Sequence, residues 1–85
     1  MVTKPIIYGH EFCPQARYLQ SYLDRKSVAY EWRDIVDGDP HYRDELRLLA
    51  RGFLSVPTVV FPDGQVMVEP DPGEVLARLK SSVKP

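Results

Sequence analysis

Residues 5–19 read PIIYGHEFCPQARYL, and their pattern changes at Cys13, the only cysteine in the chain. Before the change, Pro5–Tyr8 is a short β-branched and aromatic run closed by a glycine, which is typical of a buried strand. After it, Pro14 suits the first turn of a helix, and apolar residues follow at helical spacing. The stretch therefore predicts a strand, a short loop and a helix that runs from Pro14 to near Lys26.

The middle of the chain predicts a second strand and a second helix. Aromatic and charged side chains alternate over Ala29–Ile35, as on a strand with one wetter face. Asp37-Gly38 then turns the chain, and Asp39-Pro40 places a capping residue before a proline at the first helical position. The helix that follows carries an apolar stripe and ends near Gly52.

The last third of the chain predicts a hairpin and a closing helix. Residues 57–61 and 65–69 are two short strands joined by Pro62-Asp63-Gly64, which is the strongest hairpin signal in the sequence. Asp71 then combines a helix cap with a following proline, and an acidic residue and an apolar stripe complete the pattern of a helix.

These elements predict an α/β protein with the order β-α-β-α-β-β-α. The first strand, helix and second strand form a crossover unit with a parallel pair, and the hairpin adds an antiparallel pair. We therefore expect a four-stranded mixed sheet with helices on both faces, in one domain that covers residues 1–85 with frayed ends at Met1–Thr3 and Val83–Pro85. Functional sites in such sheets lie where strands lead into helix N-termini, and Cys13 occupies such a junction.

The composition, with 44% hydrophobic and 27% charged residues, fits one soluble globular domain. The 11 lysines and arginines nearly balance the 12 acids, so no basic surface for a nucleic acid is expected. No apolar run approaches the roughly 20 residues of a membrane helix, and the apolar patch near the N-terminus is too short for a secretory signal. The unpaired thiol suits a reducing compartment, so we expect a cytoplasmic protein. We also expect a monomer without nucleic-acid or membrane partners. The histidines and the cysteine lack the spacing of a zinc site, so no metal is expected.

Cys13 stands where a nucleophile would be placed. The free N–H groups and the partial positive charge at a helix N-terminus favour a thiolate, and Pro14 keeps the first turn formed. The alternative is that Cys13 is a small apolar residue beneath a loop, as free cysteines often are. Position alone leaves both interpretations open, since thiol reactivity also requires exposure.

Five segments occur in an order that is shared with one family: the strand IIY, a C-P-x-x segment opening a helix, the strand YEWRDI, the segment SVPTVVFPDG and the closing helix EVLARL. In this order the chain resembles a glutaredoxin of the thioredoxin-like superfamily, especially the mycoredoxin-like kind, over nearly its whole length. The most specific match is Ser55–Thr58, which is similar to the family's T-V-P segment. The resemblance implies that Pro57 is cis and faces the cysteine, and that the Val56 backbone pairs with a bound glutathione-like thiol. Without the resemblance, Pro57 reads as an ordinary trans proline at the start of an edge strand.

The sequence departs from the family at two positions near the cysteine. Dithiol glutaredoxins carry C-P-x-C, but the second cysteine position is Ala16 here, so no internal disulfide can form. The family usually has a lysine three residues before the nucleophile, where it helps to hold the thiolate and the bound thiol's carboxylate. That position is His10, which donates hydrogen bonds but is only partly charged near neutral pH; its alternative is a loop histidine without a role.

Further candidates lie outside this segment. The glycine-aspartate pair that contacts the glutamyl end of glutathione in the family is replaced by Glu69-Pro70-Asp71, where Asp71 also serves as a helix cap. Arg51 is a candidate to bind a carboxylate, although the arginines of its helix also suit a solvated face. Phe12 is a candidate to shield the thiol or to form a recognition surface, the alternative being an ordinary exposed aromatic. The candidate set comprises Cys13 as nucleophile and, for binding the small thiol, His10, Phe12, Pro14, Gln15, Arg51, Val56, Pro57 and Asp71.

The function favoured by this set is monothiol thiol–disulfide exchange on mixed disulfides between a protein and a small thiol. Cys13 would attack the small-thiol half and release the protein thiol, and a second small thiol would regenerate Cys13. The co-substrate would be glutathione or a mycothiol-like thiol, and no bound cofactor is expected. The alternative is a non-catalytic thioredoxin-like module that has lost dithiol activity. A relative of the glutathione transferase N-terminal domain is less favoured, because that class carries a further helical domain. A relative that binds an iron–sulfur cluster is disfavoured too, because the glycine-phenylalanine-serine after its cysteine is missing here.

Overall fold

The computed structural model describes residues 4–82, so the ends expected to fray, Met1–Thr3 and Val83–Pro85, lie outside the described residues. The elements follow in the predicted order: β1 (Ile6–Gly9), α1 (Pro14–Arg25), β2 (Glu31–Asp34), α2 (His41–Leu49), β3 (Thr58–Val60), β4 (Val66–Val68) and α3 (Pro72–Ser82). Three strands are shorter than predicted. In β2 the reason is that β1 offers only four residues for the parallel register, so Ala29, Tyr30 and Ile35 fall outside the strand.

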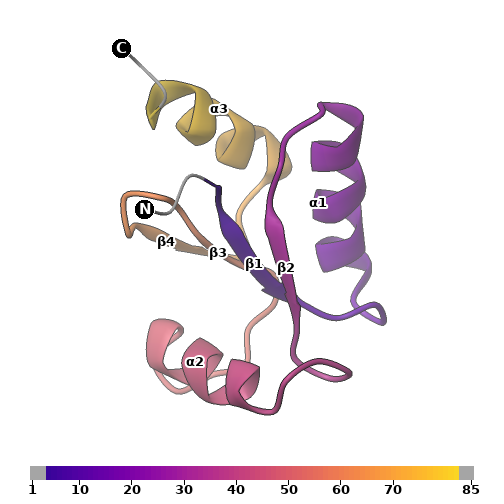
Figure 1. Ribbon diagram of the computed structural model, residues 1–85, viewed down its shortest axis with the longest axis vertical. Helices are drawn as coiled ribbons and strands as arrows, with labels where there is room; N and C mark the ends of the chain where they lie inside the picture. Colours follow the sequence, from indigo (N-terminus) through magenta and orange to yellow (C-terminus); the bar gives the residue numbers. More distant parts are fainter. Residues whose placement is uncertain (1–3, 83–85) are drawn as a thin grey trace.

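The four strands form one mixed sheet in the order β2-β1-β3-β4. β1 pairs with β2 in parallel and with β3 antiparallel, and β3 pairs with β4 antiparallel. In Figure 1, α1 and α3 lie on one side of the sheet and α2 lies on the other. The predicted mixed sheet with helices on both faces is therefore confirmed. No helix within residues 4–82 is long and apolar enough to cross a membrane.

The core has two parts because successive side chains of a strand point to opposite faces. In the central strand β1, Ile7 packs towards α1 and α3, whereas Tyr8 packs towards α2. The buried residues of the first part are Ile7, Leu19, Leu23, Val59, Phe61 and Val75. The buried residues of the second part are Tyr8, Ile35, Leu46 and Ala50.

A polar cluster joins α2 to the sheet. The Tyr8 hydroxyl donates a hydrogen bond of 2.7 Å to Glu45 Oε1, and Arg33 Nη1 donates to both the Tyr8 oxygen and Glu45. The Arg33 guanidinium also lies over the rings of Tyr8 and Tyr42. Burial and the hydrogen bond to the Glu45 carboxylate raise the pKa of Tyr8 to about 12. The cluster therefore holds β1, β2 and α2 together through one hydroxyl, one carboxylate and one guanidinium.

The start of α2 is capped by Asp39, as the sequence predicts. The assigned helix begins at His41, and Pro40 precedes it with a helical backbone, φ −55°. The Asp39 carboxylate accepts a hydrogen bond of 2.9 Å from the His41 N–H, and this bond lowers the pKa of Asp39.

Tyr8→Phe should lower the free energy of unfolding by about 1 kcal/mol, the net contribution of a typical hydrogen bond, because the ring stays while the bridging hydroxyl is lost. Tyr18→Phe is the matched control, since Tyr18 is exposed and its hydroxyl forms no hydrogen bond within residues 4–82. That change should stay within about 0.5 kcal/mol. Urea unfolding followed by circular dichroism measures both, and equal losses would contradict a role for the cluster.

Candidate functional site

Cys13 occupies the N-cap position of α1, and Pro14 is the first helical residue. The cysteine backbone is extended, with φ −99° and ψ 109°, and its carbonyl accepts the first bond of the helix from the Arg17 N–H at 3.0 Å. The thiol is partly buried, and its Sγ lies 3.8 Å from the carbonyl oxygen of Val56, to which it donates a weak hydrogen bond. The structure thus brings together two candidates that are 43 residues apart in the sequence.

The segment containing Val56 and Pro57 is held in place from two directions. The bond between these residues is cis, as the resemblance implies, and Pro57 is buried. Thr58 Oγ1 donates a hydrogen bond of 2.8 Å to the Ser55 carbonyl, and the Glu69 N–H donates one of 2.7 Å to the Pro57 carbonyl. Sequence reasoning missed the positioning role of Thr58, which only its complete burial reveals.

His10 opens the loop that leads to Cys13. The Cys13 N–H donates a hydrogen bond of 3.2 Å to the His10 carbonyl, which closes the loop as a turn. The His10 ring lies 6.4 Å from the Phe12 ring, centroid to centroid. Its Nδ1 is buried and has no hydrogen-bond partner among the described residues, an arrangement that costs free energy. The contact of His10 with Cys13 runs through the backbone, so its role towards a bound thiol stays a prediction.

Three residues, Gly9, Ala16 and Trp32, pack closely together near the start of α1. Ala16, at the position of the second cysteine in dithiol glutaredoxins, has an exposed fraction of 0%. A β-carbon at Gly9 would lie 3.1 Å from the Ala16 β-carbon and 2.6 Å from Cη2 of Trp32. Gly9 is therefore required for the close packing of the Trp32 ring on the end of β1. The sequence spacing does not reveal that Trp32 packs on Gly9, because the two residues meet only through the sheet register.

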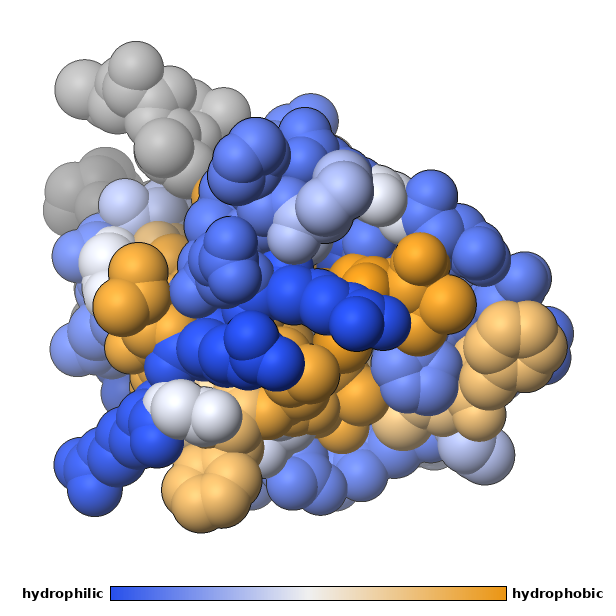
Figure 2. Space-filling model, turned by 90° about the horizontal axis from the view of Figure 1, so that it is seen from below, coloured by the Kyte–Doolittle hydropathy of each residue, from blue (hydrophilic) through white to orange (hydrophobic). Residues whose placement is uncertain are grey.

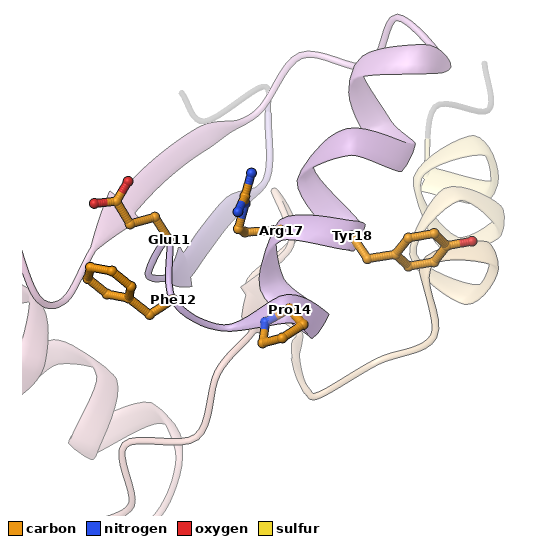
Figure 3. A pocket seen from close by; sticks show the side chains of 5 residues that line it. All are labelled: Glu11, Phe12, Pro14, Arg17 and Tyr18. Atoms are coloured by element: carbon orange, nitrogen blue, oxygen red, sulfur yellow. The ribbon is translucent and has the colours of Figure 1, made fainter.

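Two candidates, Phe12 and Pro14, line an open pocket of about 440 Å³ together with Glu11, Arg17 and Tyr18. Figure 3 shows Glu11 and Phe12 on the loop before α1, with Pro14, Arg17 and Tyr18 on its first turns. The candidate Gln15 is exposed on the same first turn.

Arg51 lines a second pocket, of about 500 Å³. The lining of this pocket includes Ser55 and residues of α2 and β4, but not Cys13. Arg51 has a left-handed backbone, φ 57°, and follows Ala50, the C-cap residue of α2. Figure 2 looks onto the α2 side of the molecule, where hydrophilic side chains cross an apolar surface. Exposed apolar residues of α2 and the following segment include Leu48 and Phe53.

Asp71 caps α3, as the sequence predicts. Its Oδ2 accepts a hydrogen bond of 3.0 Å from the Gly73 N–H, and its carbonyl accepts bonds from the next turn. The binding of a small thiol by Asp71 stays a prediction. No cluster of three or more potential metal-ligating side chains occurs in the described part of the chain.

Comparison with known proteins decides the family. Residues 3–67 match the family model described as Glutaredoxin. The chain belongs to the glutaredoxin family. Membership implies a function of the thiol–disulfide oxidoreductase kind, with thiols and protein disulfides as partners.

Individual proteins are also similar to this glutaredoxin. The thioredoxin-like protein BC3987 is 32% identical over 89% of this chain and 99% of its own, with a TM-score of 0.73. A glutaredoxin from Archaeoglobus fulgidus has the same TM-score at 23% identity, over 91% of this chain and 85% of its own, and shows the shared fold. An uncharacterized protein of Haemophilus influenzae is 28% identical over 80% of this chain and 91% of its own length.

Gly9→Ala in this glutaredoxin should lower the free energy of unfolding by about 1–3 kcal/mol, the usual cost of forcing extra atoms into a filled core. The loss should shrink in a Trp32→Leu background, because the smaller side chain leaves room for the new methyl group. Urea unfolding of the four proteins of this double-mutant cycle measures the coupling. An equal loss in both backgrounds would show that Trp32 is not what excludes a side chain at position 9.

Proposed function

We propose that this glutaredoxin is a monothiol oxidoreductase that removes a small thiol from protein mixed disulfides. The observation that carries the proposal is the placement of Cys13 at the N-terminus of α1, partly exposed and 3.8 Å from the Val56 carbonyl. A helix N-terminus carries a partial positive charge and free N–H groups, which is the general setting in which reactive thiols are found. The chain has no other cysteine, so chemistry at Cys13 requires an external second thiol.

The reaction consists of two exchanges. In the first, the Cys13 thiolate attacks the small-thiol sulfur of the mixed disulfide; a Cys13–small thiol disulfide forms, and the protein leaves as a thiolate that takes a proton from water. In the second, the thiolate of another small thiol attacks the small-thiol sulfur bound to Cys13. This step forms the oxidised small-thiol dimer and returns the Cys13 thiolate. One external small thiol is thus oxidised for each mixed disulfide that is reduced, and it ends in the dimer with the small thiol removed from the protein.

The Val56 backbone is suited to hold a peptide-like thiol such as glutathione. Among the described residues, its N–H has no hydrogen-bond partner, and its carbonyl accepts only the weak bond from Sγ. An extended peptide can pair with such a segment through both groups. This pairing favours glutathione or another peptide-like small thiol as the co-substrate.

A monomeric, cytoplasmic enzyme fits this chemistry. A single thiol that works by exchange needs a reduced pool of small thiols, and such pools are found in reducing compartments.

Cys13→Ser should abolish the reduction of a glutathionylated peptide, because a hydroxyl cannot form the intermediate disulfide. Ser21→Ala, an exposed position on α1, is the matched control and should retain full activity. Release of the peptide thiol in the presence of reduced glutathione measures the rate. Mass spectrometry after exposure to oxidised glutathione should find one glutathione on the native chain and none on the Cys13→Ser variant. Undiminished activity of Cys13→Ser would refute the proposal.

Two variants of Asp71 separate capping from thiol binding. Asp71→Ser keeps a good helix cap without the carboxylate, whereas Asp71→Ala loses both and should lower the free energy of unfolding by about 1 kcal/mol. If the carboxylate binds the amino end of glutathione, both variants should raise the KM for reduced glutathione several-fold. A native KM in Asp71→Ser would remove Asp71 from the binding set and leave it as a cap.

A further inference from the structure

We propose that the pocket lined by Glu11, Phe12, Pro14, Arg17 and Tyr18, here called the α1 pocket, binds the protein half of the mixed disulfide. Its occupant is an extended segment next to the reacting cysteine of the partner protein, with an apolar side chain and a nearby acidic residue. The inference rests on the proposed function and names a binding site for the second half of the substrate.

The α1 pocket is lined by the two residues that flank Cys13 in the chain, and its lining does not include Val56. Phe12 and Pro14 flank Cys13 directly in the chain, and both line the pocket. Sγ itself contacts the Val56 carbonyl, and Val56 is not part of the pocket lining. Sγ therefore contacts a backbone segment suited to a small peptide-like thiol, and the residues on either side of Cys13 line a separate, open pocket.

The geometry of disulfide exchange calls for such a second surface. The attacking, central and leaving sulfur atoms lie close to a line, so the leaving protein is separated from Sγ by the small-thiol sulfur. Its chain must then rest on residues that surround Cys13. The pocket containing Arg51 is a poorer candidate, because no residue that lines it adjoins Cys13.

The lining of the α1 pocket has the composition of a recognition surface. Phe12 is 73% exposed and Tyr18 is 56% exposed, so both rings are accessible to a partner. Tyrosine and arginine are also the residue types enriched among residues that dominate binding energy. Phe12 and Pro14, candidates for the small-thiol site by sequence, would on this geometry contact the protein instead.

The charges of the α1 pocket are available to a partner. Glu11 and Arg17 are exposed, and within residues 4–82 neither takes part in an ion pair. Figure 3 shows both side chains projecting from the same side of the loop and helix start. An acidic residue of the partner can pair with Arg17 without displacing any existing contact, which is the charge complementarity on which the assignment relies.

Three disulfide substrates that share glutathione and differ in the leaving group test the proposal. The first is the mixed disulfide of glutathione with 2-mercaptoethanol, whose leaving group is too small to fill the α1 pocket. The other two are glutathionylated peptides with phenylalanine near the cysteine, followed by aspartate in one and lysine in the other. Values of kcat/KM are measured for each substrate with reduced glutathione as reductant.

Tyr18→Ser should lower kcat/KM about five-fold for both peptides and leave the small substrate unchanged. Arg17→Glu should lower the value about five-fold for the aspartate peptide and raise it for the lysine peptide, in line with the strength of an exposed ion pair. Leu48→Ser and Arg25→Glu are the controls, exposed changes on α2 and on the last turn of α1, and should alter none of the three values.

The outcomes separate this inference from the proposed function. The α1 pocket does not bind the leaving protein if Tyr18→Ser and Arg17→Glu have the native kcat/KM for both peptides. The same conclusion follows if the two variants lower kcat/KM equally for all three substrates. If the native protein reduces none of the three substrates, the proposed function itself fails. Activity on the small substrate that persists in the variants shows that they fold.

Discussion

The antiparallel pairing of β1 with β3 is the constraint on which the site depends. The register sets Tyr8 opposite Thr58, so the residues that follow β1 and those that precede β3 leave the sheet at the same end of these two strands. The loop to Cys13 and the segment of Val56 must therefore meet there, and the contact between Sγ and the Val56 carbonyl follows. Complete burial of Thr58 ties this end of β3 to the core, so the sheet fixes where the two segments that carry Cys13 and Val56 begin.

Local signals explain why so much of the fold could be predicted from the sequence. Asp39 and Asp71 cap helices, and Cys13 precedes a helix that begins at Pro14, because each of these effects acts within one turn of the chain. The cluster of Tyr8, Arg33 and Glu45 could not be predicted, since its members are 12 to 37 residues apart and meet only through strand register and helix docking.

The surroundings of Arg51 show the same limit. The sequence suggested Arg51 as a carboxylate-binding candidate near Val56, but it could not show that the chain reverses at Arg51-Gly52 through two left-handed residues. Arg51 then lines a pocket with β4 residues, and Cys13 is not part of its lining. A spacing of five residues constrains position on a helix or strand, where the rise per residue is fixed, but not across a reversal of this kind. The family pattern located Val56 and Pro57 correctly because these residues directly precede β3, and β3 pairs with β1, the strand that leads to Cys13.

The buried alanine at position 16 connects the packing to the order of the chemical steps. With no thiol there, and with Ala16 enclosed beside Gly9 and Trp32, a disulfide formed on Cys13 in the proposed reaction would be resolved only by a thiol arriving from solvent. That thiol must reach the small-thiol sulfur from the direction in which the protein departed, because each exchange needs its three sulfur atoms near a line. A leaving protein held too tightly beside Cys13 would block the incoming small thiol. A shallow, half-polar pocket fits this requirement better than a deep apolar one, since contacts of modest strength allow rapid release between the two exchanges.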